Sequence, residues 1–436
     1  MRHRRPPRRR RGRAARPASG PRVGRRRHDR RAAGGLSVGA GHSHGHGTSL
    51  GPVPRHLKVL IGLLVGPLVL ATVVGLALLW PDGDLEITSP GADVERGTAE
   101  VQEVGACPQA IDVEGCQVAQ VELLSGPGAP GTAAALLPYG ELAPAVEPGD
   151  RIIVSFTAQA PEGEQYAFQD FDRGPPLLTL TILFAVGVLA LSRWRGIGAL
   201  ASLAYSLVLI ALFTLPAIME GSSPLAVAVV TAAAIMLVTL YLSHGFDVRS
   251  TVAMLGTLVS LVVIGLLGWV FTGVGHFTGV VDEGSQYISG IAAQVDLRGL
   301  LLAGLVIGAL GVLDDVTVTQ TWAVWELADL DPDASARSLF VRAMRIGRSH
   351  AASTVNTLVL AYVGATLPLM LVFSALDLPF GIAVSQEIVA QEVVRGLVGG
   401  LGILAAVPVT TAIAALVAGR LVREGRTTDV GPSHRA

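Results

Sequence analysis

The chain has 436 residues, of which half are hydrophobic and only 5% are aromatic, and its mean hydropathy is +0.54. This composition is typical of a polytopic membrane protein and argues against a water-soluble globular domain. The formal net charge of −1 hides a division along the chain. Residues 1–37 hold 15 of the 33 basic residues and one of the 34 acidic residues, whereas residues 81–176 hold 17 acidic residues and three arginines.

The first segment, residues 1–56, is rich in Arg, Pro and Gly and has no hydrophobic periodicity, so we predict a disordered cytoplasmic tail. Its arginine run could bind anionic lipid or nucleic acid, although we expect no nucleic-acid partner. A simpler hypothesis is that Val38 is the true start of the chain, which an intact-mass measurement of natively expressed protein would decide.

A histidine-rich motif, GHSHGHG, follows in the same segment and contains His42, His44 and His46. Alternating imidazoles on a flexible chain can bind Zn, Ni or Cu weakly. The alternative is a polar tail that meets metal only incidentally. No other cofactor is expected, apart from a coupling cation or proton.

Eight apolar segments predict eight transmembrane helices, near residues 57–80, 177–192, 196–216, 224–242, 250–272, 299–321, 354–376 and 396–418. The second segment is short and is expected to include Pro175 and Pro176. Arginines cluster in alternate loops, at residues 193–195, 249, 337–348 and 420–426. Because basic loops stay in the cytoplasm, both termini should be cytoplasmic and residues 81–176 should lie outside.

The outside segment shows strand-like alternation at Ala99–Val104, Cys116–Leu124 and Arg151–Ala158, separated by Gly/Pro turns. We therefore predict a small β-barrel or sandwich over residues 81–176. Cys107 and Cys116 are the only cysteines, and both fall on the oxidising side of the membrane. A disulfide that closes one hairpin loop is expected.

The sixth predicted span carries two adjacent acids, Asp314 and Asp315, before the helix has left the hydrocarbon. If Trp322 and Trp325 mark the inner boundary, Asp315 lies roughly 10 Å inside it. A charge at that depth costs ~2.5 kcal/mol or more, so Asp315 should face protein or water. Its face repeats at helical spacing through Gly304, Gly308, Gly311, Asp315, Thr319 and Trp322.

Those glycines predict close packing by another helix, and the last span, with Gly396, Gly399, Gly400 and Gly402, is the best candidate. Asp314 lies about 100° round the helix from Asp315, so the two acids need not share a role. Asp315 is read either as an ion, proton or substrate site, or as a polar residue that pins one helix to its neighbour.

Between these spans, residues 328–353 predict an amphipathic helix at the membrane surface, capped by Asp331 with Pro332 at its first position. Asn356 opens the next span and is expected to hydrogen-bond across to another helix. The predicted organisation is therefore a tail (1–56), a first helix (57–80), an extracytoplasmic β-rich domain (81–176), a seven-helix domain (177–419) and a cytoplasmic tail (420–436).

Three stretches together resemble the bacterial YibE/YibF family of multi-pass membrane proteins: GALGVLDDVTVTQTWAVWEL (308–327), STVNTLVLAYVGATLPLML (353–371) and QEVVRGLVGGLGILAAVPVTT (391–411). The similarity covers roughly residues 140–420, including YAFQDFDRGPPL before the second span. The resemblance implies a multi-pass protein of the bacterial inner membrane, places the family's acid on Asp315, and carries a permease-like label inferred from topology.

Two functions follow from these observations. The first is a permease or secondary transporter of unknown substrate, with Asp315, Asp314, Thr319, Asn356 and Glu392 as polar positions along a path. The second is a non-catalytic membrane scaffold whose outside domain binds an envelope component. Such a protein could act as a homo-oligomer or with a membrane partner. Enzyme activity is not expected, because no nucleophile motif or phosphate-binding GxxxxGK[ST] occurs.

Overall fold

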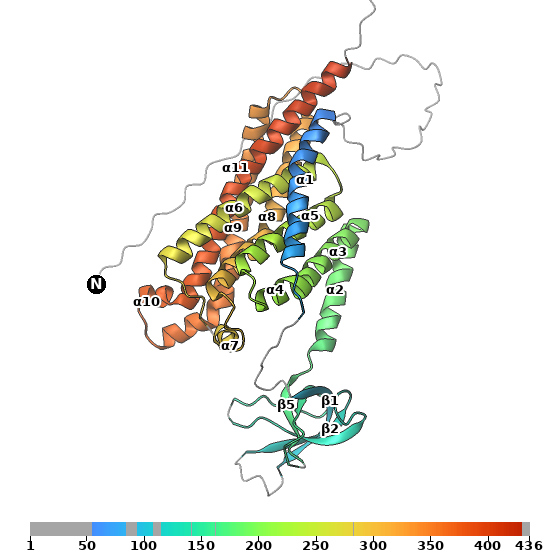
Figure 1. Ribbon diagram of the computed structural model, residues 1–436, viewed down its shortest axis with the longest axis vertical. Coiled ribbons are helices and arrows are strands. Elements are labelled where there is room, and N and C mark those ends of the chain that lie inside the picture. Colours follow the sequence, from blue (N-terminus) through green and yellow to red (C-terminus); the bar gives the residue numbers. More distant parts are fainter. Residues whose placement is uncertain are drawn as a thin grey trace, which may run out of the picture. The chain divides into compact units, whose positions relative to one another are not determined.

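The computed structural model describes residues 55–83, 94–107, 115–140, 142–161, 163–281 and 283–429 (Figure 1). The three histidines of the GHSHGHG motif and nearly all of the predicted tail lie outside these residues. The described chain is mainly helical, with one group of five strands between the first helix and the second.

Seven helices in the described part of the chain are long and apolar enough to cross a bilayer. They are α2 (Gly174–Ser192), Gly196–Met219, α5 (Pro224–His244), α6 (Val248–Val274), α8 (Leu297–Leu330), α9 (Ala336–Ala375) and the Glu387–Leu421 part of α11 (Glu387–Asp429). They coincide with the second to eighth predicted spans. The first predicted span is helix α1 (Arg55–Leu78), whose apolar part is Val65–Leu78. As predicted, α2 takes prolines into its first turn.

Five strands form a closed barrel in the order β1-β2-β3-β5-β4: β1 (Glu95–Ala106), β2 (Gln117–Leu123), β3 (Gly131–Leu136), β4 (Arg151–Phe156) and β5 (Tyr166–Phe171). All neighbours are antiparallel except β3 and β5. The long β1 pairs with both β2 and β4, which is the strand order of a five-stranded Greek-key barrel of the OB type. The sequence predicts β1, β2 and β4 but misses β3 and β5.

The barrel has its own hydrophobic core. It is made by alternate residues along the strands, which face inward, among them Ala99, Val121, Ile152 and Val154. Cys107 and Cys116 form a disulfide at the loop end of the β1–β2 hairpin, with their Cα atoms 5.5 Å apart. This is the pairing that the sequence predicts.

The spans continue into a second core beyond the main one. Helices α8, α9 and α11 contain 34, 40 and 43 residues, which at 1.5 Å per residue exceeds a hydrocarbon core of ~30 Å. Their ends pack with the start of α6 around a separate apolar cluster: Val248, Val252, Val324, Trp325, Ala328, Leu339, Ala343, Ala414, Ala415, Ala418 and Leu421. These helices therefore extend past the bilayer as a packed bundle.

This second core corrects two expectations. Residues 336–353 are not a separate surface helix, because α9 runs unbroken from Ala336 to Ala375, and its cap is Ser335, whose hydroxyl accepts from Ser338 N at 3.2 Å. Trp325 is buried inside the cluster and does not mark a membrane boundary.

The glycine-mediated contact between α8 and α11 is also wrong in its details. The two helices do pack together, but Gly304, Gly308 and Gly311 of α8 are exposed. On α11, Gly399 and Gly400 instead lie against Leu358 and Val355 of α9. The physical reason is that the glycines of α11 face α9 and, at Gly402, Ile264 of α6, so a row of glycines alone did not identify its partner.

Candidate functional site

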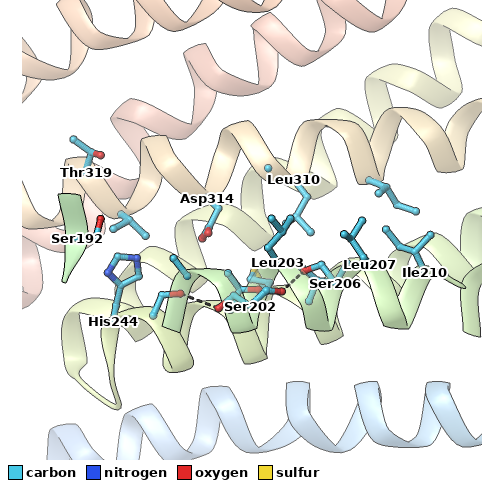
Figure 2. Close-up of a pocket in the computed structure, with 18 of the residues that line it drawn as sticks. Ser192, Ser202, Leu203, Ser206, Leu207, Ile210, His244, Leu310, Asp314 and Thr319 are labelled. Atoms are coloured by element: carbon cyan, nitrogen blue, oxygen red, sulfur yellow. Dashed lines mark hydrogen bonds between the residues drawn. The ribbon is translucent and has the colours of Figure 1, made fainter. Parts of the chain in front are cut away.

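A pocket of about 960 Å³ opens between the end of α2, helix α3 (Trp194–Leu209), α5 and α8. Figure 2 shows Asp314 of α8 projecting into it, with the hydroxyls of Ser202 and Ser206 on the opposite helix. The remaining lining residues are Ser192, Ala199, Leu203, Leu207, Ile210, Ile235, Met236, Thr239, Ser243, His244, Ile307, Leu310, Gly311, Val318, Thr319 and Trp322.

Helical periodicity explains why these residues meet. On α3 the lining positions 199, 202, 203, 206 and 207 recur at steps of three or four, and on α8 positions 307, 311, 314, 318 and 322 do the same. Each set forms one stripe of its helix. The stripe of α3 carries serines where its other faces carry Leu, Ala and Val.

The polar part of the pocket is a short chain of serine hydroxyls. Ser202 Oγ donates to the carbonyl oxygen of Gly198 at 2.8 Å and lies 2.9 Å from Ser243 Oγ of α5 (Figure 2). Ser206 Oγ donates to the carbonyl oxygen of Ser202 at 2.9 Å. The bond between Ser202 and Ser243 holds α3 to α5, and the bonds within α3 fix the hydroxyl oxygens at the pocket wall.

The carboxylate of Asp314 is different, because its Oδ1 atom is buried and has no hydrogen-bond partner among the described residues. The same holds for Thr239 Oγ1, which lines the same pocket. A buried polar atom without a partner costs about 1–3 kcal/mol, and more when it is charged. Such atoms need an explanation, and an absent ligand or ion is one.

An irregular helix closes the apolar end of the pocket. After α3, the chain forms a π-helical segment, η1 (Ile210–Thr214), and then α4 (Leu215–Met219). Leu215 N–H donates to the carbonyl of Ile210, five residues back. Pro216 follows at once and has no N–H, and membrane helices accommodate proline by such local adjustments. π-Segments are frequent at functional sites, and Ile210 is itself a lining residue.

Trp322 lines the pocket and is held from behind by a charged pair. The guanidinium carbon of Arg249 lies 4.5 Å from the centre of the Trp322 ring, and the Arg249 residue is only 8% exposed. Arg249 Nε is 3.5 Å from Asp247 Oδ2, while Asp247 Oδ1 accepts from Val248 N at 2.6 Å and caps α6. The positive charge of Arg249 is therefore matched locally and is not directed at Asp314.

Asp315, the acid favoured from the sequence, has a different environment. Its side chain is 70% exposed, on the open glycine face of α8, and its Oδ2 lies 3.9 Å from Nε2 of His350 on α9. The expectation that Asp315 is enclosed between glycine-bearing helices is therefore wrong. Its neighbour Asp314, one position and about 100° away, occupies the pocket.

The structure brings together only some of the predicted path residues. Thr319 lines the pocket with Asp314. Asn356 is exposed on α9 and makes no cross-helix bond among the described residues. Glu392 is paired with Arg395 on α11, and Arg395 lies over Tyr362.

The sequence interpretation missed the hydroxyl and imidazole groups that share the pocket with Asp314. They are Ser192, Ser202, Ser206, Thr239, Ser243 and His244. Their signal was present as serines or threonines spaced four residues apart in apolar spans, at 202 and 206 and again at 239 and 243. No group of three or more His, Cys, Asp or Glu that could hold a metal ion occurs within the described ranges.

Seven long apolar helices, four of which line a pocket that contains Asp314, define this chain as a polytopic membrane protein. The model of the YibE/F-like protein family matches residues 180–420, so the chain belongs to that family. The match includes every residue that lines the pocket and excludes the barrel. No curated protein and no solved structure matches the chain.

Proposed function

We propose that this protein is a permease of the bacterial inner membrane, and that its substrate or coupling ion binds at Asp314. The observation that supports this most directly is the buried, unpartnered Oδ1 of Asp314 in a pocket between membrane helices. Acids within membrane segments are costly, and those that face a cavity mark ion or substrate pathways. The π-helical segment η1 at the pocket end also supports a functional site there, because such segments are frequent at functional sites.

A catalytic role has less support than transport. Paired-acid chemistry needs two carboxylates that share one proton. Asp314 is the one acid in the pocket lining, and Asp315 points to a different face of the same helix. We therefore propose transport rather than catalysis. The proposed mechanism includes a coupling cation or proton and no resident cofactor.

The test starts in cells, because the substrate is not yet identified. Metabolite and metal contents are compared between cells that lack the gene and cells that express the wild type, Asp314→Asn or Asp315→Asn. Solutes that change are then offered to proteoliposomes that contain the purified protein. We expect uptake with the wild type and with Asp315→Asn, and loss of uptake with Asp314→Asn. Equal uptake by all three proteins would refute the assignment of Asp314.

The barrel supports a second candidate, a membrane scaffold that binds an envelope partner. The barrel is closed, has its own core and lies outside the region matched by the family. In that case, replacing residues 81–176 by a short linker abolishes function, whereas Asp314→Asn is tolerated. The permease hypothesis predicts the reverse order of severity for the two changes.

A further inference from the structure

The pocket at Asp314 has two chemically different halves (Figure 2). One half is polar and holds Asp314 and Ser202, with Ser192, Thr239, Ser243, His244 and Thr319 around them, whereas Ser206 lies further along α3, between Leu203 and Leu207. The other half is aliphatic, and its lining includes Leu203, Leu207, Ile210, Ile307 and Leu310. Apolar atoms dominate the lining, as in most sites for small organic molecules.

The size of the pocket argues against a bare ion as its only occupant. Sites for organic ligands measure ~300–1000 Å³, and this pocket measures about 960 Å³. A proton or metal ion at Asp314 would leave the aliphatic half unused.

The charges of the lining select the sign of the ligand. Asp314 is the one acidic residue in the lining, and the lining contains no Lys or Arg. Arg249, behind Trp322, is paired with Asp247. A carboxylate in a medium of low dielectric favours a cation and repels an anion. An organic acid or phosphate is therefore disfavoured.

The hydrogen-bonding state of the lining selects the head group. Asp314 Oδ1 is an acceptor without a donor, and Thr239 Oγ1 is also unpartnered. A protonated amine supplies N–H donors to both oxygens, whereas a quaternary ammonium has none to give. An ammonium–carboxylate hydrogen bond is roughly twice as strong as a neutral one.

We propose that the pocket binds an amphipathic organic monocation, a protonated amine attached to a compact apolar body. Its ammonium group pairs with Asp314, and its apolar body fills the aliphatic half beside Leu207 and Ile210. This inference rests on the proposed function for the role of Asp314, and it adds the class of substrate that the permease carries.

The experiment uses three probes with the same hydrocarbon cage: adamantan-1-amine, adamantan-1-ol and adamantane-1-carboxylate. At neutral pH they carry a positive, a zero and a negative charge. Binding of each tritiated probe to the purified full-length protein in nanodiscs is measured by equilibrium dialysis, with empty nanodiscs as background. We expect the wild type to bind the amine at least about tenfold more tightly than the other two probes.

Three variants locate the binding. Asp314→Asn should remove the preference for the amine, and Asp315→Asn, the matched control one position along the same helix, should keep it. Leu207→Trp fills the aliphatic half and should weaken all three probes. Similar affinities of the wild type for the three probes, or equal losses with Asp314→Asn and Asp315→Asn, would overturn the proposal. The wild-type comparison stands even if Asp314→Asn fails to fold.

The binding assay also separates this proposal from the proposed function, because it needs no transport. If the amine binds at Asp314 but no solute is carried, the permease assignment fails and the binding class stands. If a different solute is carried in an Asp314-dependent manner and the amine does not bind, the substrate class is wrong and the permease assignment stands.

Discussion

At the scale of single residues, Asp314 and Asp315 are neighbours in the sequence with opposite surroundings. Asp314 presents a buried oxygen without a partner, and Asp315 is largely exposed beside His350. A structural polar residue would stabilise the fold through its contacts, whereas a binding residue is held at a cost until its ligand arrives. Stability measurements therefore distinguish the two roles of Asp314.

We predict that Asp314→Asn raises the unfolding temperature of the ligand-free protein, because a neutral amide costs less to bury without a partner than a charged carboxylate does. Asp315→Asn should change stability by less than ~0.5 kcal/mol, as exposed substitutions usually do. Fluorescence-monitored thermal unfolding of the purified protein in detergent measures both. A lower unfolding temperature for Asp314→Asn would show instead that this carboxylate pins helices together.

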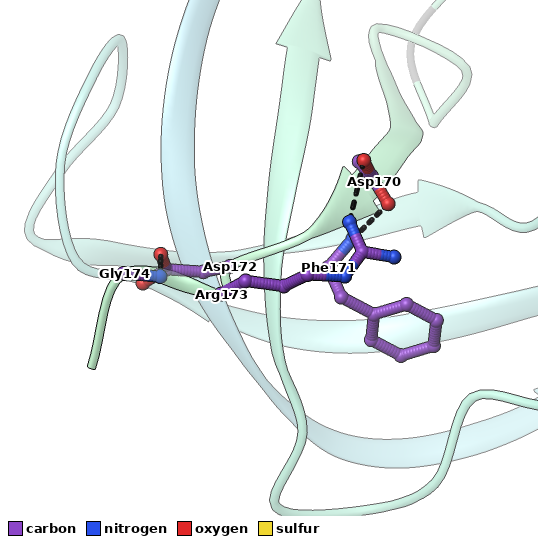
Figure 3. Close-up of polar contacts among 5 residues, drawn as sticks. All are labelled: Asp170, Phe171, Asp172, Arg173 and Gly174. Carbon is purple, nitrogen blue, oxygen red and sulfur yellow. Dashed lines mark hydrogen bonds and ion pairs between the residues drawn. The ribbon is translucent and has the colours of Figure 1, made fainter. Parts of the chain in front are cut away.

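A second residue-scale contact lies where the barrel leads into α2 (Figure 3). Arg173 Nη1 donates to Asp170 Oδ2 at 2.8 Å, Phe171 N donates to Asp170 Oδ1 at 2.8 Å, and Gly174 N donates to Asp172 Oδ1 at 3.0 Å. The hydrogen bond from Arg173 is the main reason that the pKa of Asp170 is lowered. The contact joins the end of β5 to the first turn of α2.

We predict that this junction keeps its order at neutral pH and loosens only in acid. Because the folded-state pKa of Asp170 is depressed, its contribution is complete above the ordinary carboxyl pKa of ~3.9 and is lost as the pH falls through the lower folded value. Asp170→Ala should therefore increase amide hydrogen exchange at Phe171 near neutral pH. Unchanged exchange in that variant would show that the contact does not order the junction.

The acid of the site illustrates what could be predicted from the sequence at this scale. Two acids within an apolar span correctly indicated a polar position on α8. The choice between them depended on which face of α8 other helices cover, and at Asp314 that is decided by α3 and α5, far away in the chain. The sequence did not indicate Ser202 and Thr239, because isolated hydroxyls in membrane spans commonly bond to their own backbone and do not mark a site by themselves.

At the scale of helices and strands, a close contact of α9 with its neighbours centres on Gly347. A β-carbon added there would lie 2.6 Å from Gln320 Oε1 on α8 and 2.6 Å from Val407 Cγ1 on α11. Gln320 is 2% exposed, and its Nε2 donates to the carbonyl oxygen of Ala343 at 3.0 Å. Gly347 therefore allows α8, α9 and α11 to meet around a buried amide.

We predict that Gly347→Ala destabilises the protein by about 1–3 kcal/mol, because the extra methyl group overpacks this contact. Gly364→Ala is the matched control on the same helix, since nothing lies within 4 Å of its added β-carbon. The control should gain up to ~1 kcal/mol from helix propensity. Thermal or denaturant unfolding in detergent gives both signs, and a stabilised Gly347→Ala protein would contradict the packing described.

Elements with a regular pattern were predictable, and elements without one were not. Alternation in the sequence located β1, β2 and β4. By contrast, β3 reads GTAAAL and is mostly alanine, which is a weak strand former, and β5 reads YAFQDF, in which apolar and polar residues do not alternate. The unbroken length of α9 was missed because the change from amphipathic to apolar sequence near residue 353 was taken as a boundary. The helical backbone needs no break there, since the polarity of its surroundings changes and its hydrogen bonding does not.

At the scale of the whole molecule, the order of the spans was predictable because the membrane requires ~20 apolar residues for each crossing. Their packing was not, because lipid and helix interiors are equally apolar, so hydropathy does not reveal which faces meet. This explains why the sequence located α8 and α11 correctly yet assigned the wrong contacts to their glycines. The second core at the helix ends was missed for a related reason, since Trp325 suits both a membrane interface and a protein interior.

The orientation of the molecule gives the last prediction. Basic residues cluster in alternate loops and at the end of α11, and this pattern predicts that these regions and both termini lie in the cytoplasm and the barrel outside. A fluorescent protein fused after Ala436 should therefore fluoresce, and alkaline phosphatase inserted after Gly126 of the barrel should be active. Cys107 and Cys116 should resist maleimide labelling until a reductant is added, because a disulfide persists only in an oxidising compartment. A dark fluorescent protein with an inactive phosphatase, or free thiols in the native protein, would show that the topology is the opposite one. The Ser192 and His244 end of the Asp314 pocket would then face the outside rather than the cytoplasm.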